Sequence, residues 1–94
     1  MLCPTPPDKL CDARGRPHFL WDNDLTLDEL KQRLASPDTA VRAYWIAVTM
    51  RQARPDDALS LIPLSEMHAH WPSICRHLGR ERAFWTWYLG QRVA

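Results

Sequence analysis

The sequence predicts an all-α protein, a small bundle of about five or six short helices, and three observations lead to this fold class. Apolar residues recur three and four positions apart in several segments, which is the spacing of one helix face. No segment alternates apolar and polar residues for long enough to suggest a strand. Eight prolines among 94 residues divide the chain into short helices, because proline interrupts a helix interior.

Composition and length narrow the class of protein. The 94 residues allow one small domain, and 46% hydrophobic with 24% charged residues is typical of a globular chain. A net charge of +1 gives no electrostatic indication of a nucleic-acid binder. The apolar stretches are too short for a membrane span, and no signal-peptide pattern opens the chain. Three cysteines do not form a disulfide framework, so we expect a cytoplasmic protein with no membrane partner.

The N-terminal part divides into an arm and the start of the domain. Residues 1–17 contain four prolines and no apolar period, which predicts a flexible N-terminal arm ahead of a single all-α domain over 18–94. Thr26 and Glu29 fit a capping box, in which the two side chains pair with free amides at a helix start. We therefore expect a first helix over about 27–35, with its leucines on one face.

The second helix is expected to form the centre of the bundle. Ser36 can act as its N-cap and Pro37 suits its first position, and the helix runs to about Ala53. Its apolar residues form two sides: Val41, Tyr44, Trp45 and Val48 on one, and Ala43, Ile46, Ala47 and Met50 on the other. A helix that is apolar nearly all round is typical of a bundle centre. The first two helices together resemble one HEAT-type helix pair, with no second copy along the chain.

The remaining predicted helices are short and are separated by proline or glycine. They span about 55–62, 66–71, 72–78 and 80–93. Ser65 is the expected N-cap of the second of these, and Gly79 ends the third as a glycine just past a helix end. The last helix presents a broad apolar face that includes Phe84 and Trp85, with Trp87 at the edge of that face.

No set of residues indicates catalysis or a cofactor. The only cluster with metal-ligand chemistry consists of His68, His70, Cys75 and His77. Its spacing matches no zinc motif, so we expect structural roles for these residues, and metal binding stays an open alternative. Cys3 and Cys11 lie on the arm, where no pocket is expected to activate a thiol. The sequence therefore predicts a protein that is not an enzyme and holds no cofactor.

Two groups of residues indicate binding to a partner. Phe19 and Trp21 are apolar and are followed by Asp22 and Asp24, an arrangement typical of a docking segment for a basic partner. A solvated turn is the alternative for the two acids, and folding back onto the Trp45 side of the second helix is the alternative for the aromatic residues. We favour the interface.

The second group lies near the C-terminus. The arginines Arg76, Arg80, Arg82 and Arg92 are interleaved with Trp85 and Trp87. This pattern suits single-stranded DNA or RNA, through phosphate contacts and base stacking. The charged outer face of an amphipathic helix explains the same pattern, and the nearly neutral chain favours that explanation.

Three short motifs connect the chain to a family. They are Phe19-Leu20-Trp21-Asp22, the Ser36-Pro37-Asp38 turn and Arg82-Ala83-Phe84-Trp85. With these motifs, the chain resembles over residues 19–89 small bacterial proteins encoded beside AbiEii-type nucleotidyltransferase toxins. The resemblance implies an antitoxin or partner role and no catalytic residue. The expected partner-binding residues are Phe19, Trp21, Asp22, Asp24, Arg82, Trp85 and Trp87, and the alternative is a small DNA- or RNA-binding regulator.

Overall fold

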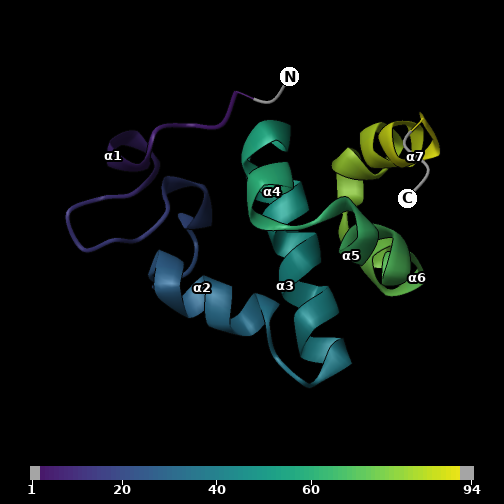
Figure 1. The fold of residues 1–94 in the computed structure, drawn as a ribbon, viewed down its shortest axis with the longest axis horizontal. Coiled ribbons are helices and arrows are strands. Elements are labelled where there is room, and N and C mark those ends of the chain that lie inside the picture. Colours follow the sequence, from purple (N-terminus) through teal and green to yellow (C-terminus); the bar gives the residue numbers. More distant parts are fainter. Residues whose placement is uncertain (1–2, 92–94) are drawn as a thin grey trace.

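Helix α3 (Thr39–Gln52) is the central element of the fold, and most of the other helices pack around it (Figure 1). The structure is a computed structural model that describes residues 3–91. In chain order the other elements are α1 (Pro7–Leu10), the 3-10 helix η1 (His18–Leu20), α2 (Leu27–Leu34), α4 (Pro55–Leu61), α5 (Leu64–Ala69), α6 (Trp71–Ile74), the 3-10 helices η2 (Cys75–His77) and η3 (Gly79–Glu81), and α7 (Arg82–Gln91). The described residues form seven short α-helices and no strand, which confirms the predicted all-α fold class.

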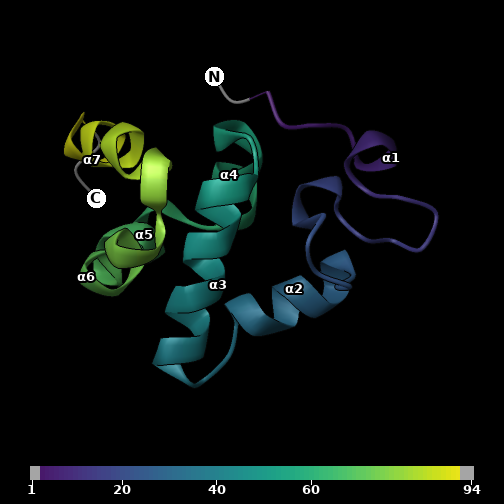
Figure 2. The ribbon, with the colours of Figure 1, turned by 180° about the vertical axis from the view of Figure 1, so that it is seen from behind.

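The other elements are distributed on two sides of α3 and α4. In Figures 1 and 2, α1, η1 and α2 lie to one side, whereas α5, α6 and α7 lie to the other. The two helices of the predicted pair, α2 and α3, contact each other directly. None of the described helices is long and apolar enough to cross a membrane.

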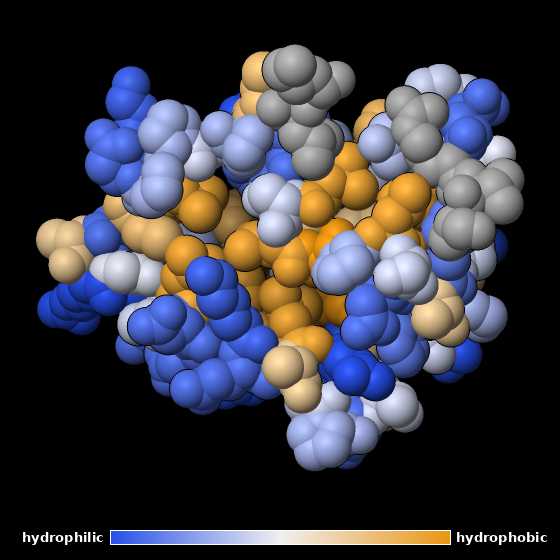
Figure 3. All heavy atoms as spheres, viewed as in Figure 1, coloured by the Kyte–Doolittle hydropathy of each residue, from blue (hydrophilic) through white to orange (hydrophobic). Residues whose placement is uncertain are grey.

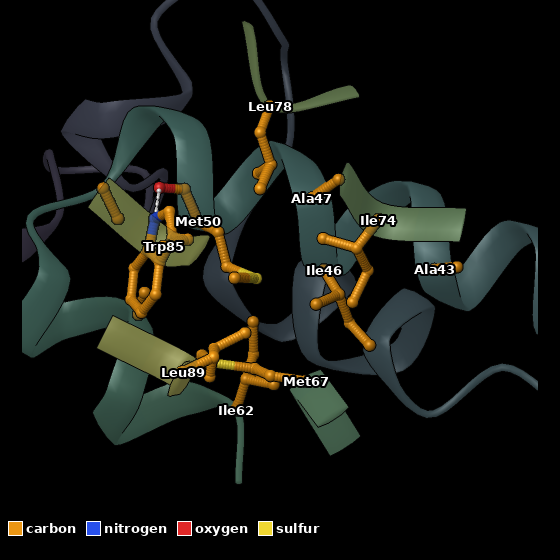
Figure 4. Packing of buried hydrophobic residues seen from close by; sticks show 12 residues of the cluster. Ala43, Ile46, Ala47, Met50, Ile62, Met67, Ile74, Leu78, Trp85 and Leu89 are labelled. Carbon is orange, nitrogen blue, oxygen red and sulfur yellow. Dashed lines mark hydrogen bonds between the residues drawn. The ribbon is translucent and has the colours of Figure 1, made fainter. Parts of the chain in front are cut away.

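Two hydrophobic clusters flank α3. The larger cluster, drawn in Figure 4, consists of Ala43, Ile46, Ala47, Met50, Ala53, Ala58, Ile62, Met67, Ile74, Leu78, Trp85 and Leu89. The smaller cluster consists of Leu20, Leu25, Leu30, Trp45 and Val48. The larger cluster joins α3 to the C-terminal helices, and the smaller cluster joins it to η1 and α2. Burial on both sides explains why the sequence of α3 is apolar nearly all round.

The predicted division of α3 into two apolar sides holds for its inner residues and fails near its start. Trp45 and Val48 lie in the smaller cluster, as their shared side requires. Val41 and Tyr44 were predicted on the same side, yet they are 38% and 43% exposed. Helix α2 has eight residues and α3 has fourteen, so α2 covers only part of that side.

Side-chain caps fix the starts of α2 and α3. Thr26 and Glu29 form the predicted capping box at the start of α2. The N-cap of α3 is Asp38, whose carboxylate accepts hydrogen bonds from two amides of the first turn at 3.0 and 3.4 Å. The prediction that Ser36 is the N-cap and Pro37 the first helical residue is therefore wrong. A carboxylate is the stronger acceptor of amide hydrogen bonds, and Ser36 accepts one from the Asp38 amide at 3.2 Å.

Two further helix boundaries follow from proline and glycine. Helix α5 begins directly after Pro63 without a side-chain cap, so the prediction that Ser65 is its N-cap is wrong. The fixed φ of proline places the boundary at Pro63. Gly79 has a φ of +55°, which fits the predicted glycine past a helix end. The last helix is described as far as Gln91, and the predicted extension to Val93 lies outside the described residues.

The predicted arm makes defined contacts with α4. The backbone amide and the hydroxyl of Thr5 donate hydrogen bonds of 2.6 and 2.7 Å to the carboxylate of Asp57. Asp57 is only 3% exposed, and these bonds supply donors to the oxygens of a buried carboxyl group in the first turn of α4. Further along, Cys11 pairs with Pro17 in an isolated bridge. The turn between them contains Gly15 with a φ of +78°.

Candidate protein-interaction surface

Three consecutive apolar residues at η1 are divided between the core and the solvent. Leu20 is 2% exposed and belongs to the smaller cluster, and Phe19 is half-buried against both clusters. Trp21 is 81% exposed. Phe19 therefore folds back against the core, which was the alternative to the interface for both aromatic residues. The indole of Trp21 instead lies at the surface.

The turn that carries Trp21 is fastened to the end of α3. The side-chain amide of Gln52 donates one hydrogen bond to the Phe19 carbonyl at 2.8 Å and another to the Asp22 carboxylate at 3.0 Å. The Asn23 side chain also donates to Asp22, at 3.1 Å. The Gln52 hydrogen bond is the main reason that the pKa of Asp22 lies below its ordinary value. Asp22 is thus exposed, ionised at neutral pH and fixed beside Trp21.

Two more aspartates and one arginine lie next to this turn. Arg16 donates from Nε to Asp12 and from Nη1 to Asp24, both at 2.8 Å. A hydrogen bond from the Arg16 backbone amide is the main cause that lowers the pKa of Asp12, and the hydrogen bond to Asp24 is the main cause that raises the pKa of Arg16. We use the name Trp21 surface for Asp12, Arg16, Trp21, Asp22 and Asp24.

A shallow polar pocket opens beside the indole of Trp21. It has a volume of about 190 Å³ and is lined by Asp12, Arg16, Pro17, His18, Leu20, Trp21 and Asn23. Pockets for drug-sized ligands typically measure about 300–1,000 Å³. The pocket therefore has room for one side chain of a partner, next to the carboxylate of Asp12.

The three predicted binding residues near the C-terminus differ in their exposure to solvent. Arg82 is exposed and Trp87 is 60% exposed, whereas Trp85 is fully buried in the larger cluster. The indole of Trp85 donates a 2.9 Å hydrogen bond to the Met50 carbonyl (Figure 4). We therefore leave Trp85 out of the interaction surface, because a partner cannot reach it in this structure.

The N-terminal and C-terminal groups do not form one surface. Helix α7 lies across α3 and α4 from the segment that carries η1, as Figures 1 and 2 show. The aromatic rings near Trp87 in the described chain belong to its own helix, with ring centroids 6.1 Å from Phe84 and 6.4 Å from Tyr88. Arg92, which belonged to the predicted basic group, lies outside the described residues.

The histidines and cysteines do not assemble into a metal site within residues 3–91, where no group of three potential ligands comes together. His70 lies 3.2 Å from the carboxylate of Glu66, and His77 makes an edge contact with Tyr44. Cys75 was predicted as a buried small residue, but it is only half-buried, with its Sγ 3.6 Å from the Pro72 carbonyl. Burial is the main cause that raises the pKa of the Cys11 thiol.

One face of the molecule carries an apolar patch between α2, α4 and α5 (Figure 3). A groove of about 300 Å³ in this region is lined by Lys31, Leu34, Ala35, Ser60 and Leu61. Leu34 and Leu61 pack against both hydrophobic clusters. The groove therefore marks the line at which the two clusters reach the surface.

Sequence reasoning missed the residues that hold the Trp21 surface in place. Gln52 lies 33 and 30 positions along the chain from its partners Phe19 and Asp22. Arg16 lies outside any helical pattern. Periodicity in the sequence therefore indicates neither residue. The only local signal was Gly15, whose left-handed conformation lets residues 12–16 turn and bring Arg16 to Asp12. The aspartates and Trp21 themselves could be recognised from their sequence proximity.

Comparison with known proteins adds no family to this description. The chain matches no protein-family model, no curated protein and no solved structure. Proposals about function therefore rest on the geometry of the Trp21 surface and, for the class of partner, on the sequence resemblance.

Proposed function

We propose that this protein is a non-enzymatic interaction module that docks on a basic protein partner through the Trp21 surface. The resemblance to proteins encoded beside AbiEii-type toxins supplies the class of partner. On that basis the partner is a nucleotidyltransferase-type toxin, and this protein acts in the cytoplasm as the antitoxin of a bacterial toxin–antitoxin or phage-defence pair.

The exposure of Trp21 is the observation that carries this proposal. Its indole is 81% exposed, although tryptophan offers more apolar area for burial than almost any other side chain. Tryptophan is also among the residues that most often dominate binding energy at interfaces. Because Gln52 already fastens the adjoining turn, docking costs little additional ordering of the backbone.

Charge determines the kind of partner. The Trp21 surface contains three carboxylates and one guanidinium, and its Asp24 side chain is 83% exposed. Carboxylates around an aromatic anchor are complementary to a surface rich in arginine or lysine, and they also exclude acidic partners. A cationic side chain can lie against the indole face and reach Asp22 or Asp24 at the same time.

The mechanism is occlusion. Trp21 enters a pocket on the toxin, the aspartates pair with its basic rim, and the body of the helical domain blocks access of substrate or nucleotide. Such a mechanism needs no catalytic group in the antitoxin. It needs only a rigid anchor and a complementary charge pattern.

Co-expression with an AbiEii-type nucleotidyltransferase and co-purification of the two proteins test the proposal. We expect a stable complex in size-exclusion chromatography, and we expect Trp21→Ala to weaken binding by about 2 kcal/mol, which is roughly thirtyfold in the dissociation constant. The control is Trp87→Ala, which removes an exposed tryptophan from the far side of the molecule. An unaffected Trp21→Ala complex, or no complex with the wild-type protein, overturns the proposal.

The second candidate is a small regulator that binds DNA or RNA through α7. The observation in its favour is that Arg82 and Trp87 are both exposed on this helix. A gel shift that weakens with salt supports it, since phosphate contacts release counterions. Retention of that shift in an Arg82→Gln/Trp87→Ala variant excludes α7 as the binding element.

A further inference from the structure

A small pocket lies between the first half of α3 and the segment α6–η2, away from the Trp21 surface. Its volume is about 130 Å³, and it is lined by Ala40, Ala43, Tyr44, Ser73, Arg76 and His77. It shares no lining residue with the Trp21 surface, so a function for this pocket stands independently of the proposed docking.

Two side chains of the pocket, Ser73 and Arg76, carry hydrogen-bond donors. Within residues 3–91, neither the Ser73 hydroxyl nor the Arg76 guanidinium forms a side-chain hydrogen bond or an ion pair, and both residues are exposed. No carboxylate lines the pocket. A guanidinium fork and a hydroxyl are the donors that suit a phosphate group, because the fork can bind two of its oxygens at once.

The wall of the pocket is held rigidly from α3. Arg51 donates from Nη1 to the His77 carbonyl at 2.8 Å, which fixes η2 against α3 and places a second guanidinium near this wall. The His77 ring lies edge-on to Tyr44 with centroids 5.5 Å apart. The carboxylate nearest along the chain, Asp38, is already occupied by amides of the first turn of α3.

Tyr44 offers an aromatic surface at the mouth of the pocket. It is 43% exposed, and its described ring neighbours, Trp45 and His77, lie at 88° and 79° to it. No parallel ring therefore stacks on Tyr44. Stacking of a base on an aromatic side chain contributes about 1–3 kcal/mol in single-stranded nucleic-acid complexes, and Val41 extends the exposed apolar area along α3.

We propose that this pocket binds the phosphate group of a nucleotide or of a single-stranded nucleic-acid end, with the base against Tyr44. Arg76 and Ser73 donate hydrogen bonds to the phosphate oxygens. The volume of about 130 Å³ accommodates a phosphate group, and the base then lies at the mouth of the pocket, on the tyrosine. Binding is recognition only and involves no bond cleavage.

Chemical-shift mapping on the full-length protein tests the site with four probes. They are adenosine monophosphate, adenosine, inorganic phosphate and a short 5′-phosphorylated RNA. We expect shifts at residues 40–44 and 73–77 with both phosphorylated nucleic-acid ligands, weaker ones with phosphate and none with adenosine. A stronger response to the RNA than to the mononucleotide identifies a strand end as the ligand, and the reverse identifies a free nucleotide. Absence of shifts in both ranges with every phosphorylated probe overturns the proposal.

Matched variants separate this site from general electrostatic attraction. We expect Arg76→Gln to weaken binding of the monophosphate about tenfold or more, whereas Arg80→Gln, an exposed arginine outside the pocket, leaves it unchanged. Tyr44→Leu weakens the nucleotide about tenfold but not inorganic phosphate. Equal losses in Arg76→Gln and Arg80→Gln, or equal binding of an acidic peptide, show that the surface attracts any anion and contradict the proposal.

Discussion

The side-chain amide of Gln52 donates a hydrogen bond of 2.8 Å to the backbone carbonyl of Phe19, 33 positions earlier in the chain. The same nitrogen donates to the Asp22 carboxylate at 3.0 Å. The two acceptors lie on either side of Leu20 and Trp21, so one amide at the end of α3 fixes the whole turn. With Leu20 buried in the smaller cluster, Trp21 is left pointing toward the solvent.

Replacement of Gln52 by alanine should loosen this turn. We expect Gln52→Ala to lower the free energy of unfolding by about 1–3 kcal/mol, because the half-buried Phe19 carbonyl and a charged carboxylate each lose a donor. Urea denaturation measures the change. The matched control is Gln32→Ala on α2, where the exposed side chain forms no hydrogen bond within the described part of the chain. A loss no larger than that of the control contradicts the role assigned to Gln52.

The sequence was sufficient to predict structural features that depend on a few neighbouring residues. The capping box of Thr26 and Glu29, the glycine at position 79 and the two-sided burial of α3 were all predicted from short patterns, since caps and helix periodicity act over one or two turns. The starts of α3 and α5 were each misplaced by two residues, because a second potential cap competed at α3 and a proline set the boundary at α5.

Features that depend on contacts between distant segments could not be predicted. Trp85 and Trp87 lie on the same helix and look alike in the sequence, yet the docking of α7 on α3 buries one and exposes the other. Met50 lies in the last turn of α3, where a backbone carbonyl lacks its helical partner, and the Trp85 indole supplies that partner. Likewise, nothing local indicates that Tyr44 and Arg76 share a pocket.

The hydrogen bond from Trp85 to Met50 should contribute measurably to stability. We expect Trp85→Phe to lower the free energy of unfolding by about 2–4 kcal/mol, since it leaves the buried Met50 carbonyl without a donor and removes buried ring volume. Trp87→Phe, at an exposed position of the same helix, should change it by less than about 0.5 kcal/mol. Thermal denaturation compares the two variants, and similar midpoints would count against the assignment of Trp85 to the core.

The capping box of Thr26 and Glu29 should make the free energy of unfolding decrease in acid. The hydrogen bond from the Thr26 backbone amide is the main cause that lowers the pKa of Glu29 below its ordinary value of 4.5. Since the folded-state pKa is the lower one, this stabilisation is complete above about pH 4.5 and is lost as the pH falls through the folded-state value. Glutamine also fits a capping box but does not titrate. We therefore expect Glu29→Gln to be less stable than the wild type near pH 7, because it lacks the carboxylate charge, and to lose less stability in acid.

Urea denaturation at several pH values between about 7 and 3 checks this expectation. The depressed pKa values of Asp12 and Asp22 act in the same direction and are common to both proteins, so they cancel in the comparison. The control is Asp8→Asn in α1, an exposed carboxylate without a hydrogen bond in the described structure. Parallel curves for the wild type and Glu29→Gln would contradict the prediction.

The contact between Thr5 and Asp57 should tie the N-terminal segment to the domain. Thr5→Val removes the hydroxyl that donates to the buried carboxylate at 2.7 Å and keeps the shape of the side chain. We expect a loss of about 1–2 kcal/mol in the free energy of unfolding and faster hydrogen exchange at the Thr5 amide, which donates to the same carboxylate. Thr39→Val, at an exposed position of α3, is the control. Unchanged exchange at Thr5 would show that the segment is held by other contacts.

The last prediction separates the anchor role of Trp21 from a role in folding. Because its side chain is 81% exposed and neither hydrophobic cluster includes it, Trp21→Ala should change the free energy of unfolding by less than about 0.5 kcal/mol. Phe19→Ala, two positions earlier, removes a ring that packs against both clusters and should cost about 2–3 kcal/mol. Circular dichroism and urea denaturation of the two variants give the answer without any partner. A loss of helical signal in Trp21→Ala would mean that the indole supports the fold, and the surface proposed for docking would then lose its anchor.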